Sequence, residues 1–232
     1  MDFDQYSTTY EREVERAIGF AGREHGFFLD AKAEAISGLC RRRGLDTAAM
    51  DALDVGCGVG LMASRLAPGF RAYHGVDPSE ESIPRARMSV PQARFDAYDG
   101  RRLPFGDDRF DLAMATLVFH HVPPAQWAEL LTEMKRVVRP GGLVVLVEHN
   151  PWNPLTRLAV RQCEFDRDAV LMPLRRTRRL FLDTGLRGLE RRFFLFLPWR
   201  LSDAGAVAWV LAGVPFGAQY LVAGSKVSGP AQ

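Results

Sequence analysis

The chain has 232 residues, of which 47% are hydrophobic, and this is enough for one well-formed core but not for two full-sized domains. A formal net charge of +2 gives no overall electrostatic reason for binding nucleic acid or an anionic membrane. Its 3 widely spaced cysteines provide neither a disulfide framework nor a zinc-binding pattern, and they favour a reducing compartment such as the cytoplasm.

The N-terminal part of the chain is predicted to be helical. Residues 1–10 lack the basic and apolar segments of a signal peptide, and no stretch of about 18 uncharged apolar residues follows that could span a membrane. A helical pattern extends from Tyr6 to Leu45, with apolar residues on one stripe, and Gly44 is placed to end it. We therefore expect residues 1–45 to form a helical cap on a soluble, cytoplasmic protein.

A glycine turn between a short apolar strand and a helix is the most informative segment. Residues 53–60 read Leu-Asp-Val-Gly-Cys-Gly-Val-Gly, between a strand predicted at 52–55 and a helix that opens at Leu61. Glycines in such a turn let the backbone approach a ligand closely. The next apolar strand, 72–76, ends at Asp77, whose carboxylate can accept hydrogen bonds from both hydroxyls of a ribose. Together these features predict a bound nucleoside.

The pattern of alternating strands and helices continues after this point. Further strands are predicted at residues 93–95, 111–117 and 143–148, with helices between them, most clearly at 126–138. Such alternation requires a parallel sheet with right-handed crossovers. We therefore predict an α/β fold with a Rossmann-like doubly wound sheet, which binds its ligand at the carboxyl ends of the strands.

Two details of the glycine turn distinguish one nucleoside cofactor from another. A dinucleotide site needs a third glycine at the place that Leu61 occupies. The charge of Asp54 would lie badly beside a diphosphate but well beside a sulfonium. The turn resembles motif I of the class I S-adenosylmethionine-dependent methyltransferases, and the resemblance extends from Leu53 to His149.

Three further segments are similar to this family in order and spacing. Residues 96–105 look like its adenine-binding loop, 110–122 like its fourth strand, which ends over the methionine part of the cofactor, and 137–149 like its helix, Pro-Gly-Gly turn and fifth strand. The resemblance implies S-adenosylmethionine as the cofactor. It also implies cofactor contacts from Asp54, Gly56, Cys57, Gly58, Asp77, Pro78, Asp99, Gly100 and Thr116, and from Tyr10 in the N-terminal segment that often caps the site in similar enzymes.

The pattern changes after His149. Residues 150–173 contain 3 prolines around Trp152, and a short helix is predicted at 156–165. The whole segment is long for a plain connection between a strand and a helix, which indicates a functional insertion. A helix at 175–184 and strands at 189–196 and 217–224 follow, and in the family the last strand forms an antiparallel hairpin with its predecessor. We expect 46–149 to be the cofactor-binding core, and 150–232 to hold the insertion and the final strands of the same domain.

The chemistry that this resemblance implies needs few catalytic groups. A methyl group on a sulfonium is already activated, so the protein must mainly orient the acceptor, and no metal is required. A general base helps only if the acceptor is a hydroxyl, and the candidates are His120, His121 and His149. For each of them packing or hydrogen bonding is the competing interpretation. Alternation along the strand lets only one of Glu148 and His149 face the site.

The sequence thus predicts direct methyl transfer from S-adenosylmethionine to a small-molecule acceptor by a monomer or homodimer, with no nucleic acid and no membrane as partner.

Three alternatives to this function remain. A nucleic-acid base methyltransferase would usually carry Asn/Asp-Pro-Pro-Tyr/Phe/Trp where this chain has Thr-Leu-Val-Phe at 116–119. An NAD-dependent oxidoreductase is disfavoured by Leu61, and an inactive nucleoside-binding protein on the same fold stays open. A lid formed by Tyr6, Tyr10 and Trp152 is a further prediction.

Overall fold

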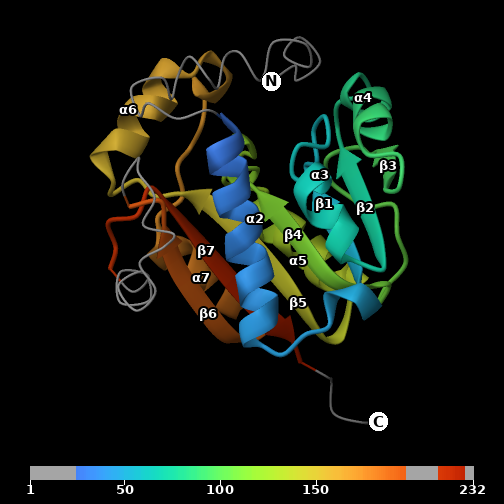
Figure 1. The fold of residues 1–232 in the computed structure, drawn as a ribbon. Helices are drawn as coiled ribbons and strands as arrows, with labels where there is room; N and C mark the ends of the chain where they lie inside the picture. Colours follow the sequence, from blue (N-terminus) through green and yellow to red (C-terminus); the bar gives the residue numbers. More distant parts are fainter. Residues whose placement is uncertain (1–24, 197–213, 228–232) are drawn as a thin grey trace.

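The part of the chain that the computed structural model describes, residues 25–196 and 214–227, forms one seven-stranded sheet with helices on both faces (Figure 1). The strand order is β3-β2-β1-β4-β5-β7-β6. The strands are β1 (Asp51–Val55), β2 (Ala72–Asp77), β3 (Arg94–Ala97), β4 (Phe110–Thr116), β5 (Val138–His149), β6 (Leu186–Phe194) and β7 (Gln219–Lys226).

The predicted topology is confirmed in both halves of the sheet. β1 pairs in parallel with β2 and β4, β2 with β3, and β4 with β5. β7 is antiparallel to both β5 and β6, which is the predicted C-terminal hairpin. The direction of winding reverses between β1 and β4, so a crevice opens at their carboxyl ends, where ligands bind in such sheets.

β5 starts earlier than the sequence pattern predicts. Val138 already pairs with Phe110, and regular pairing resumes at Leu143 opposite Leu112 after a shift of register. The predicted Pro-Gly-Gly turn is therefore an irregularity inside the strand pairing and not a separate connection. Gly141 has a φ of 83° there, a conformation that glycine adopts without strain.

The helices divide between the two faces of the sheet (Figure 1). α2, α3 and α4 pack with one apolar cluster, and α5 and α7 with the other. The helices are α2 (His25–Arg42), α3 (Ala63–Leu66), α4 (Ser82–Ser89), α5 (Trp127–Val137), α6 (Pro154–Gln162) and α7 (Leu174–Asp183), and the short 3₁₀ turns are η3 (Thr47–Ala49), η4 (Ala67–Gly69), η5 (Phe119–His121) and η6 (Glu164–Asp166).

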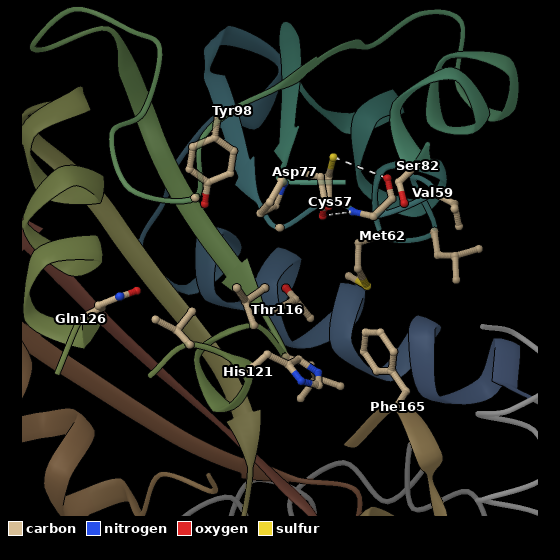
Figure 2. A pocket seen from close by; sticks show the side chains of 18 of the residues that line it. Cys57, Val59, Met62, Asp77, Ser82, Tyr98, Thr116, His121, Gln126 and Phe165 are labelled. Carbon is tan, nitrogen blue, oxygen red and sulfur yellow. Dashed lines mark hydrogen bonds between the residues drawn. The ribbon is translucent and has the colours of Figure 1, made fainter. Parts of the chain in front are cut away.

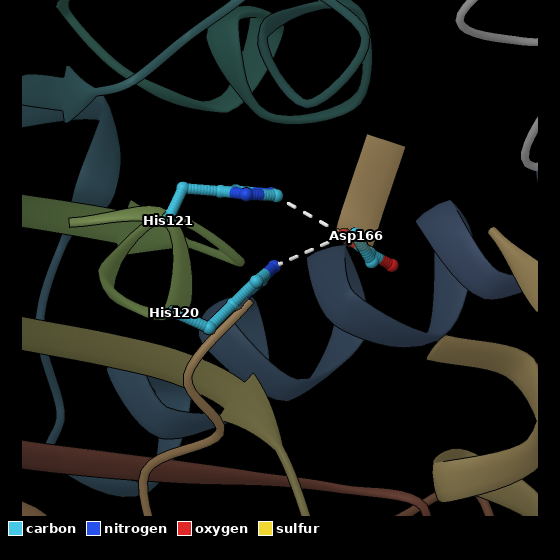
Figure 3. A group of neighbouring side chains, drawn as sticks. All are labelled: His120, His121 and Asp166. Carbon is cyan, nitrogen blue, oxygen red and sulfur yellow. Dashed lines mark ion pairs between the residues drawn. The ribbon is translucent and has the colours of Figure 1, made fainter. Parts of the chain in front are cut away.

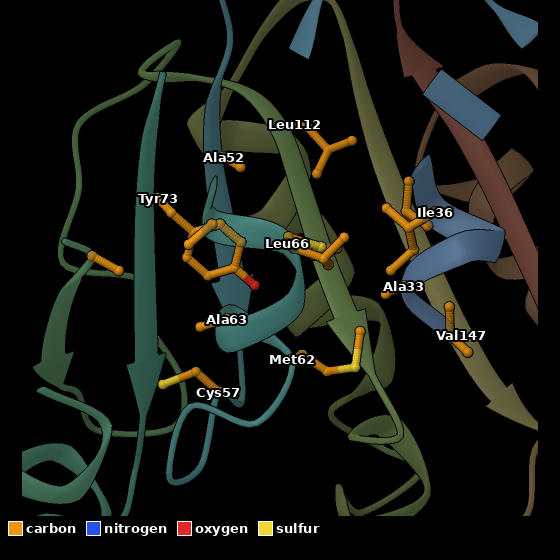
Figure 4. Packing of buried hydrophobic residues seen from close by; sticks show 14 of the residues in the cluster. Ala33, Ile36, Ala52, Cys57, Met62, Ala63, Leu66, Tyr73, Leu112 and Val147 are labelled. Atoms are coloured by element: carbon orange, nitrogen blue, oxygen red, sulfur yellow. The ribbon is translucent and has the colours of Figure 1, made fainter. Parts of the chain in front are cut away.

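Burial explains why these segments take these forms. All five residues of β1 are buried, as a central parallel strand requires when helices cover both faces. α5 buries Trp127, Leu130, Leu131, Met134 and Val137, which is the one-sided stripe of an amphipathic helix. Figure 4 shows the other cluster, in which side chains from α2 and α3 pack against the sheet.

Part of the helical segment predicted at 6–45 lies in the described residues, and there it is helical. α2 ends at Arg42, and Gly44 follows with a φ of 65° while its N–H donates to the carbonyl of Arg41. The residues before His25, with Tyr6 and Tyr10, lie outside the described residues. Within the described ranges no helix has the length and apolar character needed to cross a lipid bilayer.

An ion cluster closes the end of the sheet where β1 begins. The carboxylate of Asp51 accepts hydrogen bonds from Arg71 at 2.9 Å and from Arg109 at 2.5 Å. Asp111 accepts from the Asp51 backbone N–H at 2.8 Å and from Arg139 at 2.7 Å. Burial opposes ionisation of Asp51, but the hydrogen bonds from Arg109 and Arg71 outweigh it and hold the pKa of that carboxyl below its usual value.

We expect Asp51→Asn to lower the free energy of unfolding by about 1 to 2 kcal/mol at pH 7, since the two arginines are partly exposed and solvent screens the lost interaction. Because the folded-state pKa of Asp51 is depressed, this contribution is present above a pH of about 4 and is lost as the pH falls further. Urea denaturation measures it.

Asp96→Asn is the control for this change, because its pair with Arg87 is more than half exposed and should contribute little. Equal effects of the two substitutions at pH 7 would contradict the role assigned to the Asp51 cluster.

Candidate functional site

The glycine turn between β1 and α3 is tied to the end of β2 by its own backbone. The N–H groups of Gly56 and Cys57 both donate to the carbonyl of Val76, at 2.8 and 3.1 Å. The N–H of Gly58 donates to the Asp77 carboxylate at 2.8 Å, and the other oxygen of that carboxylate accepts from Ser79 N at 2.9 Å. The turn and the tip of β2 therefore form one hydrogen-bonded unit.

Two glycines of this turn are required for different physical reasons. A Cβ at Gly56 would lie 2.5 Å from a methyl group of Val118, so the backbone there has no room for a side chain. Gly58 has a φ of 50°, yet a Cβ there would meet no protein atom within 4 Å. Since Gly58 lines the adjoining cavity, a side chain at this position would occupy space that is left for a ligand.

A cavity of about 490 Å³, called here the large cavity, opens at the carboxyl ends of β1, β2 and β4 (Figure 2). This volume falls within the range of small-molecule sites. Most of the residues predicted to bind the cofactor line it together: Gly56, Cys57, Gly58, Asp77, Pro78, Asp99, Gly100 and Thr116. Tyr10 lies outside the described residues.

The polar groups of this wall are only partly engaged by the protein. The Asp99 carboxylate accepts from the backbone N–H groups of Arg101 and Arg102, both at 2.8 Å, and these bonds lower its pKa. The hydroxyl oxygen of Thr116 is buried and has no hydrogen-bond partner among the described residues. A buried hydroxyl without a partner is costly, so its place on the cavity wall indicates a bound polar ligand.

Asp54 does not line the large cavity. Its side chain is buried behind the turn, where it accepts a hydrogen bond from the Tyr73 hydroxyl at 2.9 Å. Burial raises the pKa of the Asp54 carboxyl to about 7, although the bond from Tyr73 acts in the opposite direction. Asp54 can therefore affect a cationic ligand through its field, but the structure does not bring it to the cavity wall.

The three candidate histidines are separated between two cavities. His121 lines the large cavity, whereas His120 and His149 line only a second cavity of about 70 Å³, called here the small cavity, which His121 also borders. Glu148 is buried, and its carboxylate holds His120 Nδ1 at 2.7 Å and accepts from the backbone N–H groups of Val118 and Phe119. Neither Glu148 nor His149 lines the large cavity, so His149 is not placed to act as a base there.

Electrostatics assigns different protonation states to the three rings. Burial opposes a proton on His120, but the carboxylates of Glu148 and Asp166 outweigh it and raise the pKa of His120 to about 10. Burial and the positive charge of His120 lower the pKa of His121 to about 3 and that of His149 to about 4. At neutral pH His120 is therefore protonated and cannot accept a further proton, whereas His121 is neutral but only a weak base.

The sequence patterns did not identify several residues of the large cavity. Lys32 from α2 and Phe165 from η6 border both cavities, and Tyr98 and Gln126 line the large one. Only tertiary packing brings these residues to the site, and no local motif marks them. Trp152 is 71% exposed and lines neither cavity, whereas Phe165 of the same insertion borders both.

Comparison with known proteins identifies the central segment. Residues 53–146 match the protein family described as a methyltransferase domain. An uncharacterized methyltransferase from Synechocystis sp. is 36% identical over 109 residues, which are 44% of this chain and 51% of that protein. The chain thus spans about half the length of this relative.

Solved structures share the whole fold. A SAM-dependent methyltransferase from Thermotoga maritima superposes with a TM-score of 0.73 and 21% identity, covering 97% of both chains. The Haemonchus contortus phosphoethanolamine N-methyltransferase 2, in complex with S-adenosyl-L-methionine, has a TM-score of 0.66 and 17% identity, covering 98% of this chain and 60% of its own. At these identities the likeness concerns the fold, and it confirms the predicted architecture.

Gly58→Val should abolish binding of an S-adenosyl ligand, because Gly58 lines the large cavity and a Cβ there would meet no atom of the described residues within 4 Å, so the new side chain would take the space of the ligand. Gly44→Val is the matched control, since Gly44 also has a positive φ and open space around it but lies at the end of α2. A β-branched residue is strained at positive φ, so both variants should melt at a lower temperature than the parent. Equal ligand binding by both variants, measured by calorimetry, would contradict the placement of the site.

Asp54→Asn should change how stability depends on pH. Because the folded-state pKa of Asp54 is raised to about 7, the native protein holds a proton between about pH 4 and pH 7 that the unfolded chain has released. This group therefore reduces the free energy of unfolding as the pH rises, by up to about 1.4 kcal/mol per pH unit, and its effect ends above the folded pKa. Urea denaturation across this range should show the slope reduced in the variant, and parallel curves would contradict the assignment.

Proposed function

Because residues 53–146 of this chain form a methyltransferase domain of the class I S-adenosylmethionine-dependent family, we propose that the protein transfers a methyl group from S-adenosylmethionine to a small-molecule acceptor. The observation that carries this proposal is the large cavity. It brings together a glycine turn, a strand-end carboxylate and a buried hydroxyl without a partner among the described residues, all at the switch point of the sheet.

The residues present fit this cofactor. The Asp77 carboxylate lines the cavity, where the hydroxyls of a ribose could donate hydrogen bonds to it. Gly58 places no side chain in the space beside Asp77. Pro78, Gly100 and Asp99 line the same part of the cavity, and an adenine ring would lie beside them. The hydroxyl of Thr116 and the amino group of Lys32 would bind the polar amino-acid end. When bound, S-adenosylmethionine supplies a methyl group that is already activated by its sulfonium.

The protein's own contribution would be orientation and exclusion of water. His121 and Phe165 border the large cavity on the side away from Tyr98 and Asp77 in Figure 2, and this is where an acceptor would be held. Holding an acceptor in line can contribute about 7 to 11 kcal/mol toward the barrier. We therefore assign His121 a role in positioning the acceptor.

A small molecule is the acceptor class that the cavity favours. Its walls leave about 490 Å³ for cofactor and acceptor together, which suits a metabolite better than a polymer. The segment 116–119 lacks the Asn/Asp-Pro-Pro-aromatic pattern of enzymes that grip an extruded base. Among the proteins with the same fold, one is named for phosphoethanolamine, a small amine.

A screen for transfer of labelled methyl groups from S-adenosylmethionine tests the proposal. Small amines, carboxylates and ring-containing hydroxyl compounds form the acceptor panel, with an oligonucleotide as the comparison class. Labelled product from one small-molecule class supports the proposal. Tight binding of the cofactor without transfer to any acceptor would favour an inactive nucleoside-binding protein, and binding of NAD in its place would overturn the cofactor assignment.

Asp77→Asn should weaken binding of S-adenosylmethionine and of its demethylated product to the same extent, because both ligands carry the ribose. The expected loss is about 1 to 3 kcal/mol, or about 5- to 150-fold in affinity, since a charge-assisted hydrogen bond is removed. Asp96→Asn is the control, because Asp96 lies on β3 at the same edge but does not line the large cavity. A loss confined to one of the two ligands would contradict a contact with the ribose.

A further inference from the structure

The small cavity brings together polar side chains, and of these the proposed function uses only His121 and Lys32. His120 and His121 from η5 meet Asp166 from η6, and the Nε2 atom of each ring lies 3.4 Å from Oδ1 of Asp166 (Figure 3). The three ligand atoms lie within 4.8 Å of one another. All three side chains are largely buried, with exposed fractions of 1%, 7% and 12%.

These distances match those around a tetrahedral metal ion. Zinc binds imidazole nitrogen and carboxylate oxygen at about 2.0 to 2.1 Å, which puts neighbouring ligand atoms about 3.3 to 3.4 Å apart. The two measured nitrogen-to-oxygen separations have this length, and they exceed that of a good hydrogen bond. The two nitrogens lie no more than 4.8 Å apart.

The arrangement around His120 is the one found behind metal-binding histidines. Its Nδ1 lies 2.7 Å from Oε2 of Glu148, which orients the ring and directs Nε2 toward Asp166. A carboxylate behind a ligating imidazole fixes its tautomer and increases its affinity for the metal. Nε2 of His120 and the carboxylate of Asp166 therefore face each other at 3.4 Å.

An independent observation comes from β7. Gln219 lines the small cavity and is 5% exposed, and its side-chain oxygen has no hydrogen-bond partner among the described residues. The cavity holds about 70 Å³, enough for an ion and a water molecule, whose share of liquid volume is about 30 Å³. A metal-bound water could donate to this oxygen.

The charges facing the cluster are also compatible with a divalent cation. Glu148 and Asp166 bring two carboxylates to it, and an ion bound at Nε2 of His120 would replace the proton held there. Lys32 and His25 from α2 and His149 from β5 line the same cavity, so Lys32 is the competing positive charge. Cys163 also lines the small cavity and is the one cysteine among its described lining residues.

We propose that His120 Nε2, His121 Nε2 and Asp166 Oδ1 form a binding site for a zinc-like divalent transition metal, with Glu148 orienting His120. Three protein ligands leave a coordination position for water, as in metal sites that act on a substrate. His121 also borders the large cavity, so the ion would lie beside the space assigned to the acceptor. Binding of the ion does not depend on the proposed methyl transfer.

Titration of the metal-free full-length protein with Co²⁺, followed by competition with Zn²⁺, tests this site. We expect one Co²⁺ per chain, a visible spectrum of a tetrahedral or five-coordinate ion, and displacement by Zn²⁺ but not by Mg²⁺. Asp166→Asn and His121→Gln should each weaken Co²⁺ binding by more than about tenfold, since changes even behind a ligand cost about 10- to 100-fold. His149→Gln, a change in a buried ring of the same cavity, should leave it within about threefold.

Three results would overturn the proposal. The first is the absence of saturable Co²⁺ binding by the parent protein, which would leave a proton on His120 as the cation between Glu148 and Asp166. The second is an equal loss of binding in His149→Gln and Asp166→Asn. The third is a thiolate-to-cobalt charge-transfer band, because the proposed ligands include no sulfur. Circular dichroism of each variant shows whether it is folded, and the parent titration decides the question by itself if a variant is not.

Discussion

The hydrogen bonds that Asp77 accepts from Gly58 and Ser79 organise the functional end of this fold. They join the glycine turn after β1 to the tip of β2, so the two loops that border the large cavity keep a fixed relation to each other. The backbone bonds from Gly56 and Cys57 to Val76 strengthen the same connection. Gly75 belongs to it as well, because a Cβ there would lie 2.8 Å from the Cys57 side chain. A rigid carboxylate at this point can meet a ribose without reorganisation.

The sequence predicted the parts of the molecule that local chemistry determines. The alternation of apolar strands and helices predicted the parallel part of the sheet. The family resemblance implied the antiparallel end of the sheet and eight cofactor-binding candidates that line the large cavity. What it could not predict depends on packing between distant segments. Asp54 has the residue type and spacing of a ligand contact, but Tyr73 holds it behind the turn. Phe165 and Lys32 reach the cavities from η6 and α2, and no spacing marks them.

The buried charges beyond β4 indicate that His120 and His121 do not act as simple catalytic bases. Glu148 accepts hydrogen bonds from Val118 and Phe119 as well as holding His120, so it fixes the backbone of η5 and the orientation of a ring at once. His121 is consequently presented to the large cavity by a rigid turn. A site built on such a turn can hold an acceptor in one orientation, which matters more for methyl transfer than basicity does.

The location of the nucleoside is the central claim, and a crystal structure with S-adenosylhomocysteine tests it most directly. We predict that the ribose hydroxyls bond to Asp77, that the adenine lies beside Pro78, Asp99 and Gly100, and that the amino-acid end approaches Thr116. The ligand should lie against Gly58 with no side chain between them. A nucleoside bound elsewhere, or with its ribose away from Asp77, would contradict the account.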